Sequence, residues 1–152
     1  MRGSRGEKEV TARATAQYNA FTNTAPFDRY VERFRRFMQS PVYDPELDVV
    51  AVAPDGQIGS FCIAWPDPVT GEGLFEPVGT HPDFQRRGLG RAVMLEGLYR
   101  LRERGMTEAC VSTNANNTPA VKLYESVGFH TVDIHVTYNK YITVQPPLEI
   151  GI

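Results

Sequence analysis

Apolar residues recur at helical spacing in two segments near the start of the chain. Residues 7–20 are compatible with a helix, and within residues 26–38 apolar side chains stand three and four positions apart with charged residues between them. After the glycine-rich stretch at residues 85–90, a helix of about four turns is predicted to end at Gly105. A last helix is predicted from Asn116 or Asn117 to about Val127. The pattern thus predicts two helices at the start of the chain and two more in its second half.

Shorter apolar runs between these helices predict strands. Residues 47–53 and 58–65 flank the turn "PDGQ" and predict an antiparallel hairpin. Residues 74–80 predict a third strand, in which Pro77 cannot donate to a ladder and therefore marks a bulge or an open edge. Residues 107–113 follow one helix later, an order that predicts a right-handed crossover and parallel pairing. The stretch "FHTVDIHVTYNKYITV", residues 129–144, predicts one or two final strands.

These elements sum to an α/β domain whose sheet mixes antiparallel hairpins with a parallel pair. A chain of 152 residues has the length of one domain, so residues 1–152 are expected to form a single unit. No strand is visible before the first helix. The opening "MRGSRG", residues 1–6, is expected to be disordered or tag-like.

Composition and charge exclude several classes of protein. With 41% hydrophobic and 22% charged residues, the chain is typical of a soluble globular protein. Its formal net charge of −2 provides no basic field for nucleic acid, and no apolar run is long enough to cross a bilayer. Cys62 and Cys110 lie in apolar, strand-like runs and are expected to be buried, reduced thiols. No signal peptide opens the chain, so we expect a cytoplasmic protein without nucleic-acid or membrane partners.

The stretch "QRRGLG", residues 85–90, places two glycines at the start of a predicted helix. Without Cβ atoms, Gly88 and Gly90 let successive N–H groups converge on an anion, and the helix adds about half a positive charge there. Arg86 and Arg87 supply countercharge, which indicates a phosphate or pyrophosphate ligand. The alternative is that the glycines only permit a tight turn between strand and helix. The spacing matches neither a nucleotide-hydrolysing P-loop nor a dinucleotide-binding motif.

Two motifs resemble those of the GNAT-type N-acetyltransferase superfamily. Residues 85–90 fit its Q/R-x-x-G-x-G/A signature, and a second signature, N-x-x-A-x-x-L-Y-x-x-x-G-F, is complete. The second signature comprises Asn117, Ala120, Leu123, Tyr124, Gly128 and Phe129. The resemblance covers residues 47 to about 141, and "FEPVGTHPDFQRRGLGRAV" is also similar to mycothiol-synthase-like actinobacterial members. Only the family's usual first strand is not visible, which leaves a truncated sheet edge or an edge completed by another chain, as in a homodimer.

This resemblance implies a GNAT fold with a central splayed parallel pair, and acetyl-CoA or another acyl-CoA as donor. The acyl group would pass directly, in a ternary complex, to the primary amine of a small molecule or the amino group of a protein. Backbone N–H groups at residues 86–91 would hold the pyrophosphate, and the pantetheine arm would lie beside the splayed strand. The residues implied in binding the cofactor are Val78, Thr80, Gln85, Arg86, Arg87, Gly88, Leu89, Gly90, Arg91 and Asn117.

The same resemblance assigns catalytic residues. Tyr124 matches the family's tyrosine that protonates the departing thiolate; the alternative is an aromatic that only packs beside Leu123. For the base we favour Glu76, which shares a face with Val78 if the pleat is undisturbed; the alternative is a carboxylate paired with an arginine. His81 is the second choice, although a position before Pro82 suits a turn.

Other chemistry-bearing residues are assigned lesser roles. Glu72 lies in the loop that approaches the third strand and is a candidate for attracting a cationic acceptor. The acceptor pocket itself is expected around residues 27–37 and 66–73. Burial of Cys110 disfavours a cysteine nucleophile. His130 and His135 have no carboxylate or cysteine at ligand spacing, so no metal site is inferred. The second hypothesis for function is an acyl-CoA-binding module with little activity, a remnant half of a tandem enzyme.

Overall fold

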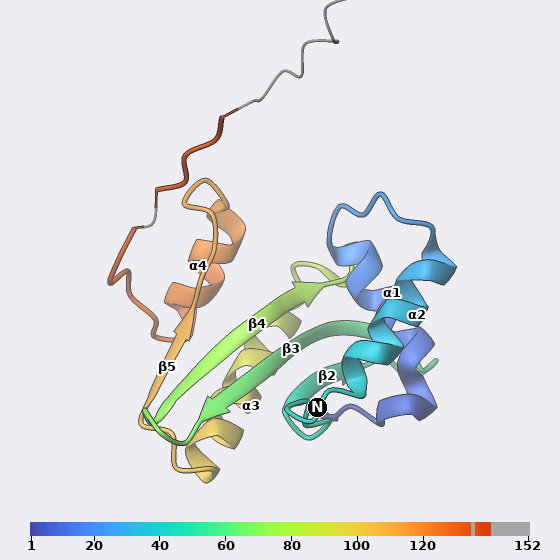
Figure 1. Ribbon diagram of the computed structural model, residues 1–152, viewed down its shortest axis with the longest axis horizontal. Coiled ribbons are helices and arrows are strands. Elements are labelled where there is room, and N and C mark those ends of the chain that lie inside the picture. Colours follow the sequence, from blue (N-terminus) through green and yellow to red (C-terminus); the bar gives the residue numbers. More distant parts are fainter. Residues whose placement is uncertain (135, 141–152) are drawn as a thin grey trace, which may run out of the picture.

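The computed structural model describes residues 1–134 and 136–140 (Figure 1). Between Arg2 and Ser126 the chain forms five strands, four α-helices and two 3-10 turns. In chain order the elements are β1 (Arg2–Gly3), the 3-10 turn η1 (Gly6–Glu9), α1 (Val10–Ala20), α2 (Phe27–Met38), β2 (Asp48–Val52), β3 (Ile58–Asp67), β4 (Glu72–Thr80), the 3-10 turn η2 (Pro82–Phe84), α3 (Leu89–Glu103), β5 (Glu108–Val111) and α4 (Thr118–Ser126).

The strands form one five-stranded sheet in the order β1-β2-β3-β4-β5. Neighbours pair antiparallel except β4 and β5, which are parallel and joined through α3. Helix α3 packs on one face of the sheet, whereas α1 and α2 lie on the other side (Figure 1). The predicted mixed sheet with a parallel pair is therefore confirmed.

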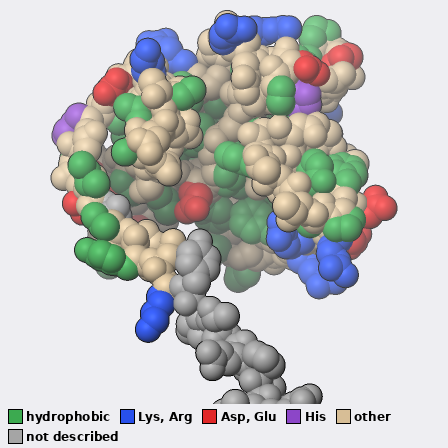
Figure 2. Space-filling view, turned by 90° about the horizontal axis from the view of Figure 1, so that it is seen from above, with side chains coloured by type: hydrophobic (Ala, Val, Ile, Leu, Met, Phe, Trp, Pro, Cys, Tyr) green, Lys and Arg blue, Asp and Glu red, His purple; other side chains and the backbone are tan. Residues whose placement is uncertain are grey.

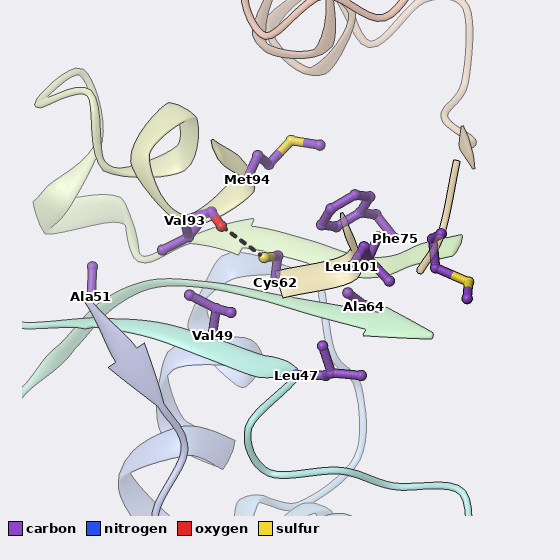
Figure 3. Packing of buried hydrophobic residues seen from close by; sticks show 10 residues of the cluster. Leu47, Val49, Ala51, Cys62, Ala64, Phe75, Val93, Met94 and Leu101 are labelled. Atoms are coloured by element: carbon purple, nitrogen blue, oxygen red, sulfur yellow. Dashed lines mark hydrogen bonds between the residues drawn. The ribbon is translucent and has the colours of Figure 1, made fainter. Parts of the chain in front are cut away.

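Strands β2 and β3 are buried on both faces because each face has a helix against it. Val49 and Cys62 point towards α3 and pack with Val93 and other residues of one hydrophobic cluster (Figure 3). The intervening residues Val50 and Phe61 belong to a second cluster, shared with α1. Since successive side chains of a strand point to opposite faces, strands covered on both sides read as the continuous apolar runs of the sequence.

The parallel pair is splayed. Pairing of β4 with β5 begins at Glu72 and Glu108 and stops at Phe75 and Val111, while β4 continues to Thr80 paired only with β3. Figure 1 shows the two strands side by side at one end and diverging towards the other. Against β3, the register of β4 shifts by one residue between Phe75 and Val78, so β4 carries a bulge around Pro77. The bulge predicted from this proline is confirmed.

The expectation that no strand precedes the first helix is wrong. Arg2 and Gly3 form β1 and pair with Val50 and Val49 of β2. Ser4 is buried, and its N–H donates to the carbonyls of Pro45 and Asp48, both at 2.8 Å. Residues 2–4, expected within a disordered or tag-like start, therefore form the sheet edge. A strand of two residues has no alternation of apolar and polar positions, so the hydrophobic pattern could not reveal it.

The final strands are also absent from the part of this region that the structure describes. Residues 129–134 and 136–140 contain neither helix nor strand, and Val132, Ile134, Val136 and Tyr138 are exposed. His135 and residues 141–144, which complete the predicted strands, lie outside the described residues. A strand needs a partner for its backbone, and within the described chain β5 pairs with β4 alone. The prediction of final strands, made from the apolar pattern, is therefore wrong for residues 129–134 and 136–140.

Candidate active site

A cleft of about 510 Å³ lies between the end of β4, the start of α3 and helix α4. We call it the glycine-loop cleft. Every residue predicted to bind the cofactor lines it except Arg87, and Tyr124 lines it as well. Figure 2 shows this side of the molecule hollowed between two groups of side chains, with hydrophobic residues inside the hollow. The sequence motifs thus converge on one cleft, although they lie about one helix and one strand apart in the chain.

Backbone N–H groups are available at the mouth of this cleft. Within residues 1–134 and 136–140, the N–H groups of residues 86–91 donate to no acceptor. Helix α3 begins at Leu89, so the last of these groups are the unpaired donors of its first turn, at the positive end of its dipole. Such a cluster of amides has the chemistry that suits an anion.

The two motif glycines are required for different reasons. Gly88 caps α3 with φ of 75°, a left-handed conformation that strains other residues, although a Cβ there would meet no atom within 4 Å. Gly90 has an ordinary helical backbone. A Cβ on it would stand 3.2 Å from Leu123 Cδ2 and 3.3 Å from Thr80 Oγ1. Gly88 therefore shapes the turn, and Gly90 keeps the cleft open between β4 and α4.

The three arginines of the loop are held differently. The Arg87 guanidinium lies 5.2 Å from the centre of the Phe84 ring, outside the cleft. Arg91 Nε donates to the carbonyl oxygen of Ser126 over 3.3 Å and so ties the start of α3 to the end of α4. Arg86 is exposed, with a left-handed φ of 57°. All three place positive charge around the free amides.

The splayed end of β4 offers further backbone groups. His81 N donates to the Gly59 carbonyl over 2.9 Å, which makes that pair a hydrogen-bonded one. Hydrogen-bonded and non-hydrogen-bonded pairs alternate along an antiparallel ladder. In the register of β3 and β4, Val78 and Thr80 are then non-hydrogen-bonded positions, and their N–H and C=O groups point away from β3. They face the gap that the divergence of β5 opens.

Helix α4 brings Tyr124 to the cleft. Asn117 caps the helix, because its side-chain oxygen accepts from Ala120 N over 3.4 Å. The Tyr124 ring is half-buried and contacts Phe129 edge to face at 6.3 Å between centroids. Burial raises the pKa of the Tyr124 phenol, and its hydroxyl has no hydrogen-bond partner among the described residues. A protonated, unpaired phenol in a cleft is a candidate proton donor.

A second cavity, of about 580 Å³, lies on the α1–α2 side of β4. We call it the aromatic cavity; it is lined by Gln17, Tyr30, Arg33, Phe34, Phe37, Trp65, Leu74, Glu76 and Pro77. The expected acceptor region at residues 27–37 supplies four of these side chains, but residues 66–73 supply none. Gln17, Trp65 and Leu74 were missed because they belong to three separate elements that only the folded sheet brings together.

Glu76 and Val78 do not share a face. The prediction assumed an undisturbed pleat, and the bulge around Pro77 disturbs it. Val78 packs with the cluster on the α3 side and lines the glycine-loop cleft, whereas Glu76 is exposed and lines the aromatic cavity. The carbonyl oxygen of Glu76 accepts from Trp65 Nε1 over 2.6 Å, which fixes the bulge against β3.

The two cavities are neighbours along two elements. On β4, Pro77 lines the aromatic cavity and the next residue, Val78, lines the glycine-loop cleft. On α1, Gln17 lines the first cavity and Ala20 the second, one turn further on. A molecule bound in one cavity therefore lies close to a molecule bound in the other, at the level of the bulge.

His81 and Glu72 lie outside both cavities. His81 Nδ1 accepts from Asp83 N over 3.3 Å, and its Nε2 lies 3.0 Å from Asn19 Nδ2, so both ring nitrogens are engaged at the turn. Glu72 is the first residue of β4, at the end opposite to Thr80, and pairs with Glu108. Neither residue is placed to act on a ligand in the cavities.

Both cysteines are free thiols. Cys62 is fully buried, its Sγ donates to the Val93 carbonyl over 3.2 Å, and burial raises its pKa (Figure 3). Cys110 is half-buried rather than buried; partial burial, with Glu72 nearby, raises its pKa to about 11. Such thiols are largely protonated at neutral pH, in agreement with the prediction that neither is a nucleophile.

Among the described residues, no group of three or more His, Cys, Asp or Glu side chains is arranged to hold a metal ion, and His130 is exposed. His135 lies outside the described residues. No helix in the described part of the chain is both long enough and apolar enough to span a bilayer.

Comparison with known families identifies the chain. The family model described as "Acetyltransferase (GNAT) family" matches residues 14–129. The chain belongs to the GNAT acetyltransferase family. The resemblance drawn from its two motifs is confirmed, and the glycine-loop cleft lies within the matched region of this GNAT domain.

Individual proteins of known name are also similar to this chain. The mycothiol acetyltransferase of Thermobifida fusca is 37% identical over 120 residues, which cover 72% of this chain and 36% of that protein. Our chain thus spans little more than a third of the curated relative. The GCN5-related N-acetyltransferase from Sphaerobacter thermophilus is 29% identical with a TM-score of 0.69, covering 85% of this chain and 40% of that one.

A more distant neighbour shows the fold alone. An aminoglycoside N-acetyltransferase solved in complex with CoA is 18% identical, with a TM-score of 0.68 over 90% of this chain and 91% of its own. The splayed strands and flanking helices of our GNAT domain are therefore shared with proteins of quite different sequence.

Proposed function

We propose that this domain binds acetyl-CoA, or another acyl-CoA, in the glycine-loop cleft and transfers the acyl group to a primary amine held in the aromatic cavity. The observation that carries the proposal is the row of free N–H groups at residues 86–91, at the start of α3 and between three arginines. CoA supplies a pyrophosphate that matches such a site and a thioester that can donate an acyl group. Family membership supports the same activity.

The residues present fit this ligand. Gly88, Leu89, Gly90 and Arg91 would bind the pyrophosphate through backbone N–H groups, with Arg86 and Arg87 as countercharge and Gln85 and Asn117 at the cleft walls. The space beside Gly90 supports the assignment, since a side chain there would fill it. Val78 and Thr80 would bind the pantetheine arm through the backbone groups that face the splayed gap.

Transfer requires three proton movements. The acceptor, an ammonium in water with a pKa of ~10.4, must lose a first proton before its nitrogen can attack the thioester carbon. As the new C–N bond forms and the C–S bond breaks, the nitrogen must lose its second proton and the departing sulfur must gain one. We assign the proton that the sulfur gains to the Tyr124 hydroxyl, whose raised pKa keeps it protonated at neutral pH. The second proton lost by the nitrogen restores the phenol through solvent. The Val78 N–H would stabilise the negative charge that develops on the carbonyl oxygen.

We assign the first proton to Glu76, directly or through water. Its support is position: it lines the aromatic cavity where that cavity meets the glycine-loop cleft, and its main chain is held by Trp65. The nitrogen that loses its proton to Glu76 then stands beside the thioester. No cysteine is used, so the acyl group passes directly from donor to amine.

The second candidate is an acyl-CoA-binding module with little activity. It is favoured by one observation: the chain spans only 36% of the mycothiol acetyltransferase that it matches. Both candidates require acyl-CoA in the same cleft. They differ in whether an amine is turned over.

Two measurements test these functions. Titration calorimetry with acetyl-CoA should give one site per chain, and absence of binding at saturating concentration would contradict both candidates. Release of free CoA thiol in the presence of a panel of primary amines then separates them. Turnover supports the acyltransferase, and tight binding without turnover of any amine supports the binding module.

Three wider expectations stay proposals. A single structural unit and a reducing, cytoplasmic location are supported by one continuous sheet and by two free cysteines. A homodimer is supported by β5, which pairs on one side only within the described chain. Sedimentation equilibrium would measure the dimer directly, and a monomer at all concentrations would contradict it.

A further inference from the structure

Resting on the proposed function, we propose that the aromatic cavity selects a primary amine carried on an apolar ring that also bears a carboxylate or similar oxyanion. Polyamines are then poor acceptors. The inference concerns the chemistry of the cavity walls, which present a cluster of aromatic rings, one carboxylate, one guanidinium and one oriented amide.

The apolar surface is continuous. Phe37 contacts Phe34 at 5.6 Å and Trp65 at 5.8 Å between ring centroids, so three rings from α2 and β3 form one wall. Phe34 is only 5% exposed, and Tyr30 of the same helix is equally buried. These rings are held by the hydrophobic core and cannot turn away to make room for hydrated groups. The wall therefore favours a planar apolar body in the ligand.

Arg33 is the free cation of this cavity. Within the described chain it forms no ion pair, and its guanidinium lies 5.1 Å from the centre of the Tyr30 ring. Arg35, two positions along, is by contrast paired with Glu7 and Glu32. An oxyanion on the ligand would find in Arg33 a cation that has no other anionic partner in the described structure.

Gln17 presents a donor rather than an acceptor. Arg13 Nη1 lies 3.1 Å from Gln17 Oε1, and a guanidinium can only donate. The amide oxygen is therefore engaged by Arg13, which is fully buried and fixed by Asp48. The amide NH₂ group of Gln17 is left for the cavity, where it can donate to a ligand oxygen. Of the charged and amide side chains in the lining, Arg33 and Gln17 thus favour an acceptor atom on the ligand, and Glu76 alone favours a cation.

Glu76 is the one carboxylate of the lining and is assigned to the reacting ammonium. A second ammonium on the same ligand would find no further anion there and would share the cavity with the Arg33 cation. Like charges repel, and a desolvated cation without a partner is unfavourable. A ligand with one cationic and one anionic group matches the cavity, whereas a dication does not.

Three amines built on the same ring test this selection. In para-(aminomethyl)benzoate, benzylamine and para-xylylenediamine, the position opposite the aminomethyl group carries a carboxylate, a hydrogen and an ammonium. With saturating acetyl-CoA, CoA thiol release should give kcat/KM highest for the benzoate, lower by about fivefold for benzylamine, and lowest for the diamine. Equal values, or a preference for the diamine, would overturn the inference.

Arg33→Gln should remove most of the preference for the benzoate over benzylamine. Arg35→Gln is the matched control, because it removes a cation from the same helix that is already ion-paired and outside the cavity lining. This control should keep the preference. If Arg33→Gln also kept the preference for the benzoate over benzylamine, Arg33 would not be the source of the selection and our inference would be contradicted. Neither arginine is buried, so both variants are expected to fold.

Failure of the inference and failure of the proposed function give different results. If calorimetry detects no acetyl-CoA binding, or if no amine of the wider panel is turned over, the acyltransferase proposal fails and the selection fails with it. If acetyl-CoA binds and amines are acetylated without the predicted order, the acyltransferase stands and only the selection is overturned.

Discussion

The two cavities beside β4 are built from different parts of the polypeptide. The glycine-loop cleft offers mainly backbone N–H and C=O groups, from the end of β4 and from residues 86–91. The aromatic cavity is built from side chains of α1, α2, β3 and β4. Only the bulge around Pro77 separates them.

This difference suggests how one fold serves many acceptors. A site made of main-chain groups depends on glycines and on the start of a helix, so few substitutions are compatible with it. A site made of side chains from four elements can change one wall at a time while the sheet is kept. Substitutions should therefore divide into two groups: those that alter acyl-CoA binding and those that alter only the amine.

The largest effect is expected beneath the aromatic cavity. Arg13 and Asp48 are both fully buried and joined by a 2.8 Å contact from Nε to Oδ1, and Tyr43 donates to the other Asp48 oxygen. Burial and the Asp48 carboxylate raise the pKa of Tyr43, so it stays a donor. Arg13→Met leaves the Asp48 charge buried without its cation and should lower the free energy of unfolding by about 3–5 kcal/mol. Chemical denaturation measures this change.

The matched control is the double variant Arg13→Met with Asp48→Asn, which removes both charges and should recover most of the lost stability. A single variant that loses less than about 1 kcal/mol would show that the pair does not hold α1 to β2.

The next effect concerns the glycine-loop cleft. Gly90→Asp places a side chain against Leu123 and Thr80 and a carboxylate beside the proposed pyrophosphate. Repulsion at close range should weaken acetyl-CoA binding by about a hundredfold or more. Gly90→Ala adds only a Cβ at 3.2 Å from Leu123 and should bind acetyl-CoA far more tightly than Gly90→Asp does. Titration calorimetry measures both dissociation constants. An unchanged affinity of Gly90→Asp for acetyl-CoA would contradict the assignment of this loop.

Tyr124→Phe tests the proposed proton donor in the glycine-loop cleft. Loss of the proton donor should lower kcat by about a hundredfold while the dissociation constant of acetyl-CoA stays the same. Because burial raises the pKa of Tyr124, the phenol loses its proton only above the ordinary value of about 10. Activity of the unmodified protein should therefore hold through neutral pH and decline only in strong alkali. A variant with equal turnover would remove Tyr124 from the chemistry.

The same contrast explains what the sequence could predict. The residues predicted to bind the cofactor, apart from Arg87, do line one cleft together with Tyr124, because Gly88, Gly90 and the motif around Tyr124 are local signals in the sequence. The face of Glu76 was predicted wrongly, because a one-residue bulge reverses the side of the sheet. Trp65 and Gln17 carry no local signal at all. β1 was missed because two residues are too few to show a period.

The smallest effect on activity is expected from Trp65→Phe. This variant tests most directly whether the amine and acetyl-CoA are bound independently in the two cavities. Phenylalanine keeps an aromatic ring in the wall but removes the Nε1 donor that holds the Glu76 carbonyl at 2.6 Å. Loss of one such hydrogen bond is worth about 1 kcal/mol, or about fivefold in kcat/KM for the amine. Affinity for acetyl-CoA should not change, because Trp65 and Glu76 do not line the glycine-loop cleft. If the variant lowered the affinity for acetyl-CoA by the same factor as kcat/KM for the amine, the bulge would couple the two cavities. The two sites, one made of backbone groups and the other of side chains, would then not be independent.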